Sequence, residues 1–179
     1  MNVFLVGYYG FSNVGDELLL LQSRSFLKSV FKDVSFLVLS PTRDTTGSVY
    51  RWSLLDIVKA IKKSDIMVFG GGSLFQNKTS QWSLLYYVGI VLLSRVLNRN
   101  YYFLGHGIGP IQGKFSNMLV RWCYRHSSGV SVRDFNSFSY LKKGGVFSFC
   151  HADMGYYNSH FNCLNYTQNT SVGVSLIPS

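Results

Sequence analysis

Acidic residues are scarce in this sequence, and their scarcity sets its charge. Eight Asp and Glu residues stand against seventeen Lys and Arg residues, which gives a formal net charge of +9. An excess of this kind is typical of proteins that bind nucleic acid, anionic membrane surfaces or acidic small molecules. The basic residues are scattered, however, and no basic-aromatic RNA-binding motif is present. We therefore expect no nucleic-acid partner and favour phosphate-bearing substrates or a membrane surface.

Cysteine is also scarce, with only Cys123, Cys150 and Cys163 and no short paired spacing among them. This pattern indicates neither a disulfide framework nor a zinc site, so no metal is expected. The segment Met1–Val6 carries no basic leader of the kind that begins a signal peptide. The longest apolar run, Leu84–Leu93, is shorter than the about 20 residues that cross a bilayer. Together these absences favour a cytoplasmic location.

Apolar residues are abundant, at 47% of the sequence, so a packed core is expected and disorder is not. Short apolar runs alternate with segments of helical periodicity, which predicts βαβ units and a doubly wound, mostly parallel, Rossmann-like α/β sheet of about six strands. The stretch Arg43–Tyr50 is polar and is predicted to be a loop. The predicted strands are Val3–Val6, Val34–Leu39, Ile66–Phe69, Tyr101–Leu104, Val130–Val132 and Val146–Phe149, and the predicted helices are Glu17–Phe31, Leu54–Ile61, Ser83–Leu97, Phe115–Tyr124 and Asp134–Leu141.

A glycine-containing loop follows the first predicted strand, in the stretch Val3–Glu17. A strand, a glycine loop and a helix start present free backbone N–H groups to an anion or a hydroxyl-rich ligand, although a plain tight turn has the same pattern. The glycines Gly7, Gly10 and Gly15 do not have the spacing of the dinucleotide fingerprint. No nicotinamide or flavin cofactor is therefore expected.

Three further loops follow predicted strands directly: Gly70–Gln76, Gly105–Pro110 and Ser131–Asp134. In a parallel sheet all of these loops emerge at the carboxyl edge, where open α/β folds bind ligands. We therefore predict a site at this edge. The candidate substrate-binding residues are Gly7, Tyr8, Gly10, Asn13, Gly15, Asp16, Gly71, Gly72, Ser73, Gln76, Gly107 and Gly109, and the candidate catalytic residues are Arg133 and His106.

Several of these residues also have a structural interpretation. Asn13 and Asp16 either contact hydroxyl groups of a ligand or brace the turn and cap the helix. His106 lies between two glycines with no bulky neighbour to bury it, so we expect it to face the ligand and to act as an acid or base near neutrality. Arg133 needs an anionic partner, which is either the ligand or a neighbouring carboxylate, Asp134 or Asp153.

Beyond the sheet, the chain changes character. Residues 1–155 are predicted to form the Rossmann-like domain, and residues 156–170, rich in Asn and Tyr, a linker. The run Val172–Leu176 reads as one more strand. Either this strand pairs with the sheet of the first domain, or residues 171–179 supply the first strand of a truncated second domain.

The motifs at the predicted edge resemble those of the polysaccharide pyruvyl transferase family. The matching stretches are GYYGFSNVGDE (Gly7–Glu17), SDIMVFGGGSLFQ (Ser64–Gln76), LGHGIGPI (Leu104–Ile111) and SVRD (Ser131–Asp134), with weaker matches at HAD (His151–Asp153) and VGVSL (Val172–Leu176). The resemblance implies a two-domain fold similar to GT-B glycosyltransferases, of which this chain is the amino-terminal half. It also implies transfer of a pyruvyl group from phosphoenolpyruvate to two hydroxyls of a cell-surface saccharide, without a cofactor.

By this resemblance, Arg133 matches a basic residue at the family's cleft, and the catalytic histidine belongs to the other half. The chain departs from the family pattern at His106, Met154 and Ile177, where glutamine, proline and arginine are common. These departures suggest a truncated or split copy that binds the acceptor, partnered by a separate carboxyl-terminal half or by a second copy. A half of a nucleotide-sugar glycosyltransferase and a non-catalytic glycan-binding remnant remain alternatives.

A peripheral membrane contact is a further expectation, because the acceptors of the resembled family are often lipid-linked. The segment Leu84–Leu93 is unusually apolar for a surface helix. Four arginines, at positions 95, 99, 121 and 125, are available to acidic headgroups at the inner face of the membrane. A core helix between the sheet and its neighbours is the alternative interpretation of Leu84–Leu93.

Overall fold

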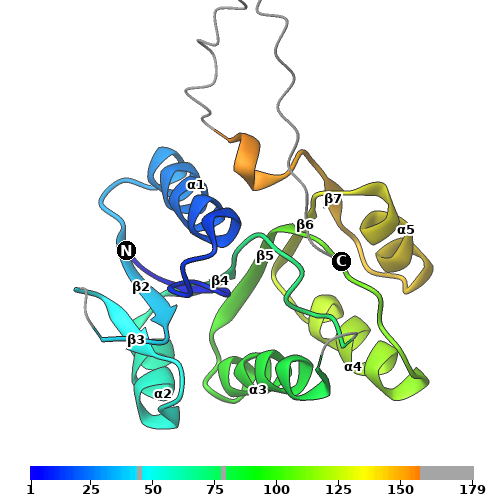
Figure 1. Cartoon of the computed structure of the whole chain (residues 1–179), viewed down its shortest axis with the longest axis horizontal. Helices are drawn as coiled ribbons and strands as arrows, with labels where there is room; N and C mark the ends of the chain where they lie inside the picture. The colour runs from blue at the N-terminus through cyan, green and yellow to red at the C-terminus, as the bar shows by residue number, and fades with distance from the viewer. Residues whose placement is uncertain (44–45, 78–79, 158–179) are drawn as a thin grey trace, which may run out of the picture.

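The computed structural model describes residues 1–43, 46–77 and 80–157. Its centre is a seven-stranded sheet in the order β3-β2-β1-β4-β5-β6-β7, and every neighbouring pair of strands is parallel (Figure 1). The predicted Rossmann-like α/β arrangement is therefore confirmed. The strands are β1 (Asn2–Val6), β2 (Ser35–Ser40), β3 (Ser48–Tyr50), β4 (Ile66–Phe69), β5 (Asn100–His106), β6 (Gly129–Val132) and β7 (Phe149–Cys150).

Helices connect the strands and cover the sheet. They are α1 (Val14–Val30), α2 (Leu54–Lys63), α3 (Gln81–Val96), α4 (Lys114–Arg125) and α5 (Phe135–Lys143), followed by a short 3₁₀ helix, η1 (Met154–Tyr156). In Figure 1, α1 lies on one side of the sheet, and α2, α3 and α4 lie on the other. The core has two parts accordingly: Val3 and Leu5 pack toward α1, whereas Phe4 and Val6 belong to the cluster that includes the other helices.

The central strands are apolar because helices cover both of their faces. All four residues Val3–Val6 are fully buried, and Met67, Val68 and Phe69 of β4 are nearly so. Parallel strands buried on both faces read as continuous apolar runs rather than as alternating ones. Such runs were the signals from which the central strands were predicted.

Polar residues at the ends of strands start the helices. Asn13 caps α1, where its Oδ1 accepts a hydrogen bond from the Gly15 backbone N–H at 3.1 Å. Asp134 caps α5 in the same way, with its Oδ1 2.7 Å from the backbone nitrogen of Ser137. These caps satisfy amide groups that have no partner within the helix. They also place the start of each helix at the carboxyl edge of the sheet.

Two details of the predicted strands were wrong. The stretch Arg43–Tyr50 was predicted to be a loop, but it contains the edge strand β3. Only Val49 of this strand is buried, so the strand is too short and too polar to show an apolar run in the sequence. Val146–Phe149 was predicted to be a strand, but β7 is Phe149–Cys150. The Val146 amide instead donates to the Leu141 carbonyl at 2.9 Å, and its buried side chain closes the end of α5.

The unusually apolar segment Leu84–Leu93 lies in α3, where Leu84, Tyr87, Val88, Ile90 and Val91 are buried. This segment therefore belongs to a core helix, which was the alternative to a membrane contact in the sequence analysis. No helix within the described ranges combines the length and hydropathy needed to cross a bilayer. The predicted linker lies largely beyond the described residues, and the predicted strand Val172–Leu176 lies wholly beyond them.

Candidate functional site

The four loops predicted to meet at the carboxyl edge do lie together. The Gly107 backbone N–H, after β5, donates to the Gly72 carbonyl, after β4, at 3.0 Å. The Arg133 guanidinium, after β6, donates through Nη2 to Ser73 Oγ at 3.3 Å. The loop after β1 closes the group, since Asp16 Oδ1 lies against Gly72. Segments far apart in the sequence thus form one surface.

A hollow of about 450 Å³ opens on this surface, and we call it the edge hollow. Its walls come from the loop after β1 together with the first turn of α1, from the loop after β4, and from the first turns of α3. The lining residues are Tyr8, Asn13, Asp16, Ser73, Leu74, Gln76, Ser83 and Tyr87. Five of them, Tyr8, Asn13, Asp16, Ser73 and Gln76, are candidates from the sequence. Amide, hydroxyl and carboxylate groups in one concave site suit a ligand rich in hydroxyl groups.

Among the residues that the structure describes, Asp16 is the only acidic one that lines the edge hollow. One of its oxygens, Oδ2, accepts a hydrogen bond from Asn13 Nδ2 at 2.7 Å. Partial burial raises the pKa of the Asp16 carboxyl, and Glu17 raises it further, whereas the Arg133 guanidinium lowers it. A carboxylate with a raised pKa is a stronger proton acceptor than an ordinary one, which is the property required of a general base.

The glycines of the edge have two roles. Gly107 and Gly109 allow side chains to lie directly over the backbone, since an added Cβ would come within 2.6 Å of Arg133 Nε and 2.7 Å of Gln76 Oε1, respectively. Gly7 and Gly71 instead make room for interior packing, by the Tyr9 ring and the Leu19 side chain. None of the four lines the edge hollow, so they shape the site without forming its wall.

Two further candidate glycines, Gly10 and Gly72, fix the loops themselves. Gly10 has a φ of +82°, and its backbone N–H donates to Glu17 Oε1 at 2.6 Å. This bond ties the first loop to the start of α1. Gly72 has a φ of +108°, and its carbonyl accepts the bond from Gly107. A positive φ favours glycine at both positions because other residues would be strained there.

Arg133 lies beside the edge hollow and is held in place by a carboxylate. Its Nη1 donates to Asp153 Oδ2 at 2.7 Å, and the two side chains are 31% and 26% exposed. The partner is thus Asp153 and not Asp134, which caps α5 instead. Arg133 and Asp153 also line a second hollow of about 600 Å³, together with Gly15, Leu18, Leu19, Gly155 and Tyr156. The guanidinium therefore forms an ion pair with Asp153 and is still accessible to a ligand.

His106 does not face the ligand site, contrary to the sequence-based expectation. It is fully buried, and its Nδ1 lies 2.7 Å from Tyr124 Oη. Burial, assisted by the nearby Arg133 guanidinium and opposed by the Gly70 backbone, lowers the pKa of His106 to about 3. The imidazole is therefore neutral at pH 7 and is no acid or base for a bound ligand. The reason is that β5 continues past the predicted end at Leu104 and takes His106 into the sheet.

Three residues of the edge hollow were missed in the sequence: Leu74, Ser83 and Tyr87. Tyr87 Oη donates to the Gly7 carbonyl at 3.4 Å and accepts from Arg51 Nη2 at 3.2 Å. Ser83 and Tyr87 are four residues apart, so they share one face of α3. Two polar side chains at this spacing on one face of a largely apolar helix are the signal that would have identified them.

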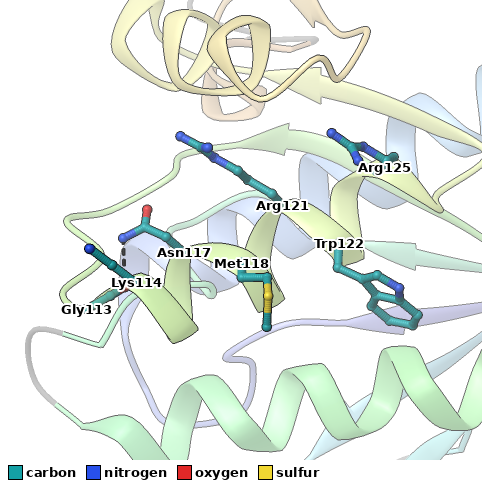
Figure 2. A pocket seen from close by; sticks show the side chains of 7 residues that line it. All are labelled: Gly113, Lys114, Asn117, Met118, Arg121, Trp122 and Arg125. Atoms are coloured by element: carbon teal, nitrogen blue, oxygen red, sulfur yellow. Dashed lines mark hydrogen bonds between the residues drawn. The ribbon is translucent and has the colours of Figure 1, made fainter.

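A larger hollow, of about 790 Å³, lies along α4. Figure 2 shows the side chains of Lys114, Asn117, Met118, Arg121, Trp122 and Arg125, all from one helix. The two arginines have partners already: Arg121 lies over the Tyr140 ring, and Arg125 donates to the Gly144 carbonyl at 2.7 Å. We place the functional site at the edge hollow because several of the predicted loops converge there, whereas the hollow on α4 is lined by that helix and the glycine before it.

One of three comparisons with known proteins gives a match. A search of curated proteins and a search of solved structures give no significant match. The model of one family, described as polysaccharide pyruvyl transferase, matches residues 13–161. The matched region begins at the cap of α1 and includes three of the four loops that form the edge. The chain therefore belongs to the polysaccharide pyruvyl transferase family.

Proposed function

We propose that the edge hollow binds the saccharide acceptor of a pyruvyl transfer in which phosphoenolpyruvate is the donor. The observation that carries this proposal is the set of polar side chains from three elements around one hollow, with a single carboxylate, Asp16, among them. Such groups hydrogen-bond sugar hydroxyls, and the family to which the chain belongs is a transferase family. No metal or cofactor takes part in the proposed reaction.

The proposed reaction joins two acceptor hydroxyls to one carbon of the donor. The CH₂ carbon of phosphoenolpyruvate takes up a proton, both hydroxyl oxygens bond to the neighbouring carbon, and the C–O bond to phosphate breaks. The two hydroxyl groups release two protons. One of them compensates for the proton that the CH₂ carbon takes up, and the other leaves with the phosphate. Asp16 would accept a proton from an attacking hydroxyl. Arg133 would stabilise the carboxylate or phosphate of the donor at the rim of the site.

The test is a reaction of the complete gene product with phosphoenolpyruvate and a saccharide acceptor, followed by mass spectrometry. We expect the acceptor to gain the mass of pyruvic acid less one water, with an equal amount of inorganic phosphate released. Asp16→Asn should reduce the rate by about a hundredfold or more, because general-base catalysis contributes at least that much. Asp56→Asn is the matched control, since Asp56 pairs with Arg43 at the exposed start of α2.

Other outcomes of this reaction would contradict the proposal. Transfer of a sugar from a nucleotide sugar to the same acceptor, with no use of phosphoenolpyruvate, would indicate a glycosyltransferase. Binding of the acceptor without turnover of either donor would indicate a non-catalytic glycan-binding protein. A rate that is unchanged in Asp16→Asn would remove Asp16 from the mechanism.

A substitution of Arg133 separates its two roles. Arg133→Lys keeps the positive charge beside Asp153 but loses the planar fork that binds a carboxylate or phosphate through two bonds. We expect turnover to fall by about a hundredfold. The free energy of unfolding should change by less than about 1 kcal/mol, because the ion pair is partly exposed. Arg43→Lys, at the exposed pair with Asp56, should change neither quantity. Lost stability with unchanged turnover would show that Arg133 serves only the fold.

The setting of the reaction also belongs to this proposal. We propose that the acceptor is a glycan or a lipid-linked saccharide, met at the inner face of the membrane by a cytoplasmic protein. Basic side chains on α3 and α4, among them Arg95 and Arg125, would contact acidic headgroups there. The rest of the catalytic machinery would come from a carboxyl-terminal half or from a second copy of the chain.

A further inference from the structure

Arg51 is a buried cation that the proposed mechanism does not use. It follows β3 and is only 4% exposed. Its guanidinium carbon lies between 4.9 and 5.5 Å from the centroids of four aromatic rings, those of Tyr8, Phe11, Trp52 and Tyr86. Aromatic faces attract cations, so this cage partly replaces the water that the charge has lost.

The hydrogen bonds of this guanidinium are incomplete. Nη2 donates to Tyr87 Oη at 3.2 Å. Nε and Nη1 are buried and have no hydrogen-bond partner among the residues that the structure describes. Among the described residues, the ion pairs between side chains are Arg43–Asp56 and Arg133–Asp153. Arg51 therefore has no carboxylate partner among these residues. A buried charge of this kind is unfavourable unless an anion or further hydrogen bonds compensate it.

Arg51 lies directly behind the wall of the edge hollow. Tyr8 and Tyr87 line the hollow on one side and contact the guanidinium on the other. Tyr8 and Phe11 stack on one another with ring centroids 4.2 Å apart, and they are 44% and 36% exposed. Both rings therefore reach solvent, and neither belongs to the two hydrophobic core clusters. An outward rotation of these rings would uncover the guanidinium.

We propose that Arg51 binds the acidic group, a phosphate or a carboxylate, of the saccharide that occupies the edge hollow. The forked N–H groups of a guanidinium match both groups and form two parallel hydrogen bonds to either. Tyr8 and Phe11 cover the guanidinium until the ligand displaces them. The inference rests on the proposed function for the nature of the ligand, a saccharide, and narrows it to acidic saccharides.

The experiment follows the side-chain N–H resonance of Arg51 by NMR in the ¹⁵N-labelled chain, without phosphoenolpyruvate. Three saccharides are titrated at constant ionic strength: glucose 1-phosphate, glucuronate and neutral methyl glucoside. We expect the Arg51 resonance to shift with one or both acidic sugars and not with the neutral one. The sugar that shifts it identifies the acidic group as phosphate or carboxylate. Shifts confined to other residues, or equal shifts with the neutral sugar, would overturn the proposal.

Two variants test the mechanism of binding. Arg51→Gln should weaken binding of the acidic sugar by about tenfold or more and leave the neutral sugar unaffected, because a bond to a charged group is lost. Arg43→Gln, at an exposed arginine three residues after the end of β2, is the matched control and should change neither. Phe11→Ala removes half of the cover, so it should bind the acidic sugar several-fold more tightly than the unmodified chain.

Phe11→Ala keeps the proposal testable if Arg51→Gln fails to fold. Weaker or unchanged binding in Phe11→Ala would contradict the covering role of the ring, and unchanged binding in a folded Arg51→Gln would contradict the anion site. These results are independent of the proposed pyruvyl transfer, because no donor is present. A chain that transfers pyruvyl groups yet shows no response at Arg51 would disprove this inference alone.

Discussion

Lowering the pH from 7 to 5 is expected to reduce the free energy of unfolding by about 2 kcal/mol through His106 alone. In the folded chain, burial lowers the pKa of His106 to about 3, against about 6.5 for an unperturbed histidine. The unfolded chain therefore binds a proton below pH 6.5, whereas the folded chain does so only near pH 3. Stability is lost across this window at about 1.4 kcal/mol per pH unit, and the loss is complete below it.

Urea unfolding at pH 7, 6 and 5 measures this effect directly. In His106→Gln the side chain does not titrate, so the difference in unfolding free energy between pH 7 and pH 5 should shrink by about 2 kcal/mol. Gln is polar and of similar size, and it can retain a hydrogen bond to Tyr124. The control is His151→Gln, which removes an exposed imidazole and should leave the pH difference in place. Equal losses in the unmodified chain and in His106→Gln would contradict a buried, neutral His106.

A buried His106 acts on the site through the backbone. Its carbonyl accepts a hydrogen bond from the Arg133 backbone N–H at 3.1 Å, across the end of β5 and β6. The bond between its imidazole and Tyr124 of α4 anchors this end of β5 to the helix layer. His106 therefore fixes the point from which Arg133 projects. Its substitution should affect ligand binding only through the position of Arg133.

The architecture and the place of the site were predictable because both depend on local patterns. Val3–Val6 and Ile66–Phe69 are apolar at every position, as strands covered on both faces must be. Glycine loops directly after such strands place Asn13, Asp16 and Ser73 at one edge by topology alone. These residues lie in the edge hollow for that reason.

What could not be predicted depends on contacts between distant segments. The burial of His106 involves Phe75 and Tyr124, both of which lie far from it in sequence. Arg51 directly follows the polar stretch Arg43–Tyr50, which was predicted to be a loop. Only the structure brings the rings of Tyr8 and Tyr86 around its guanidinium. A sequence pattern predicts which face of a helix or strand is apolar, but it does not predict which other element packs against that face.

Tyr9 links the first loop to the end of β4, and two glycines make room for it. Its ring is buried against Gly7, and its hydroxyl lies against Gly70. An added Cβ at Gly70 would overlap Tyr9 Oη, and the ring, only 1% exposed, has no free space into which to move. The hydroxyl has no hydrogen-bond partner among the described residues, so it adds volume at this contact without a compensating bond.

Gly70→Ala is therefore expected to destabilise the chain by about 2–3 kcal/mol, the usual effect of overpacking a filled core. Gly89→Ala, in the middle of α3, is the matched control: an added Cβ meets nothing within 4 Å there, so the variant should be up to about 1 kcal/mol more stable. Tyr9→Phe removes the overlapping oxygen and should alone change stability by less than about 1 kcal/mol.

The double variant Gly70→Ala/Tyr9→Phe identifies the cause of the loss. If the hydroxyl is responsible, the double variant should recover about 1–2 kcal/mol relative to the sum of the single changes, as expected for residues in contact. Additive losses would mean that the backbone at Gly70, rather than the space beside it, requires glycine. Because Gly70 has no positive φ in this structure, its backbone conformation is open to alanine. The close approach of Tyr9 is thus the physical reason for glycine at this position, and the recovered stability measures it.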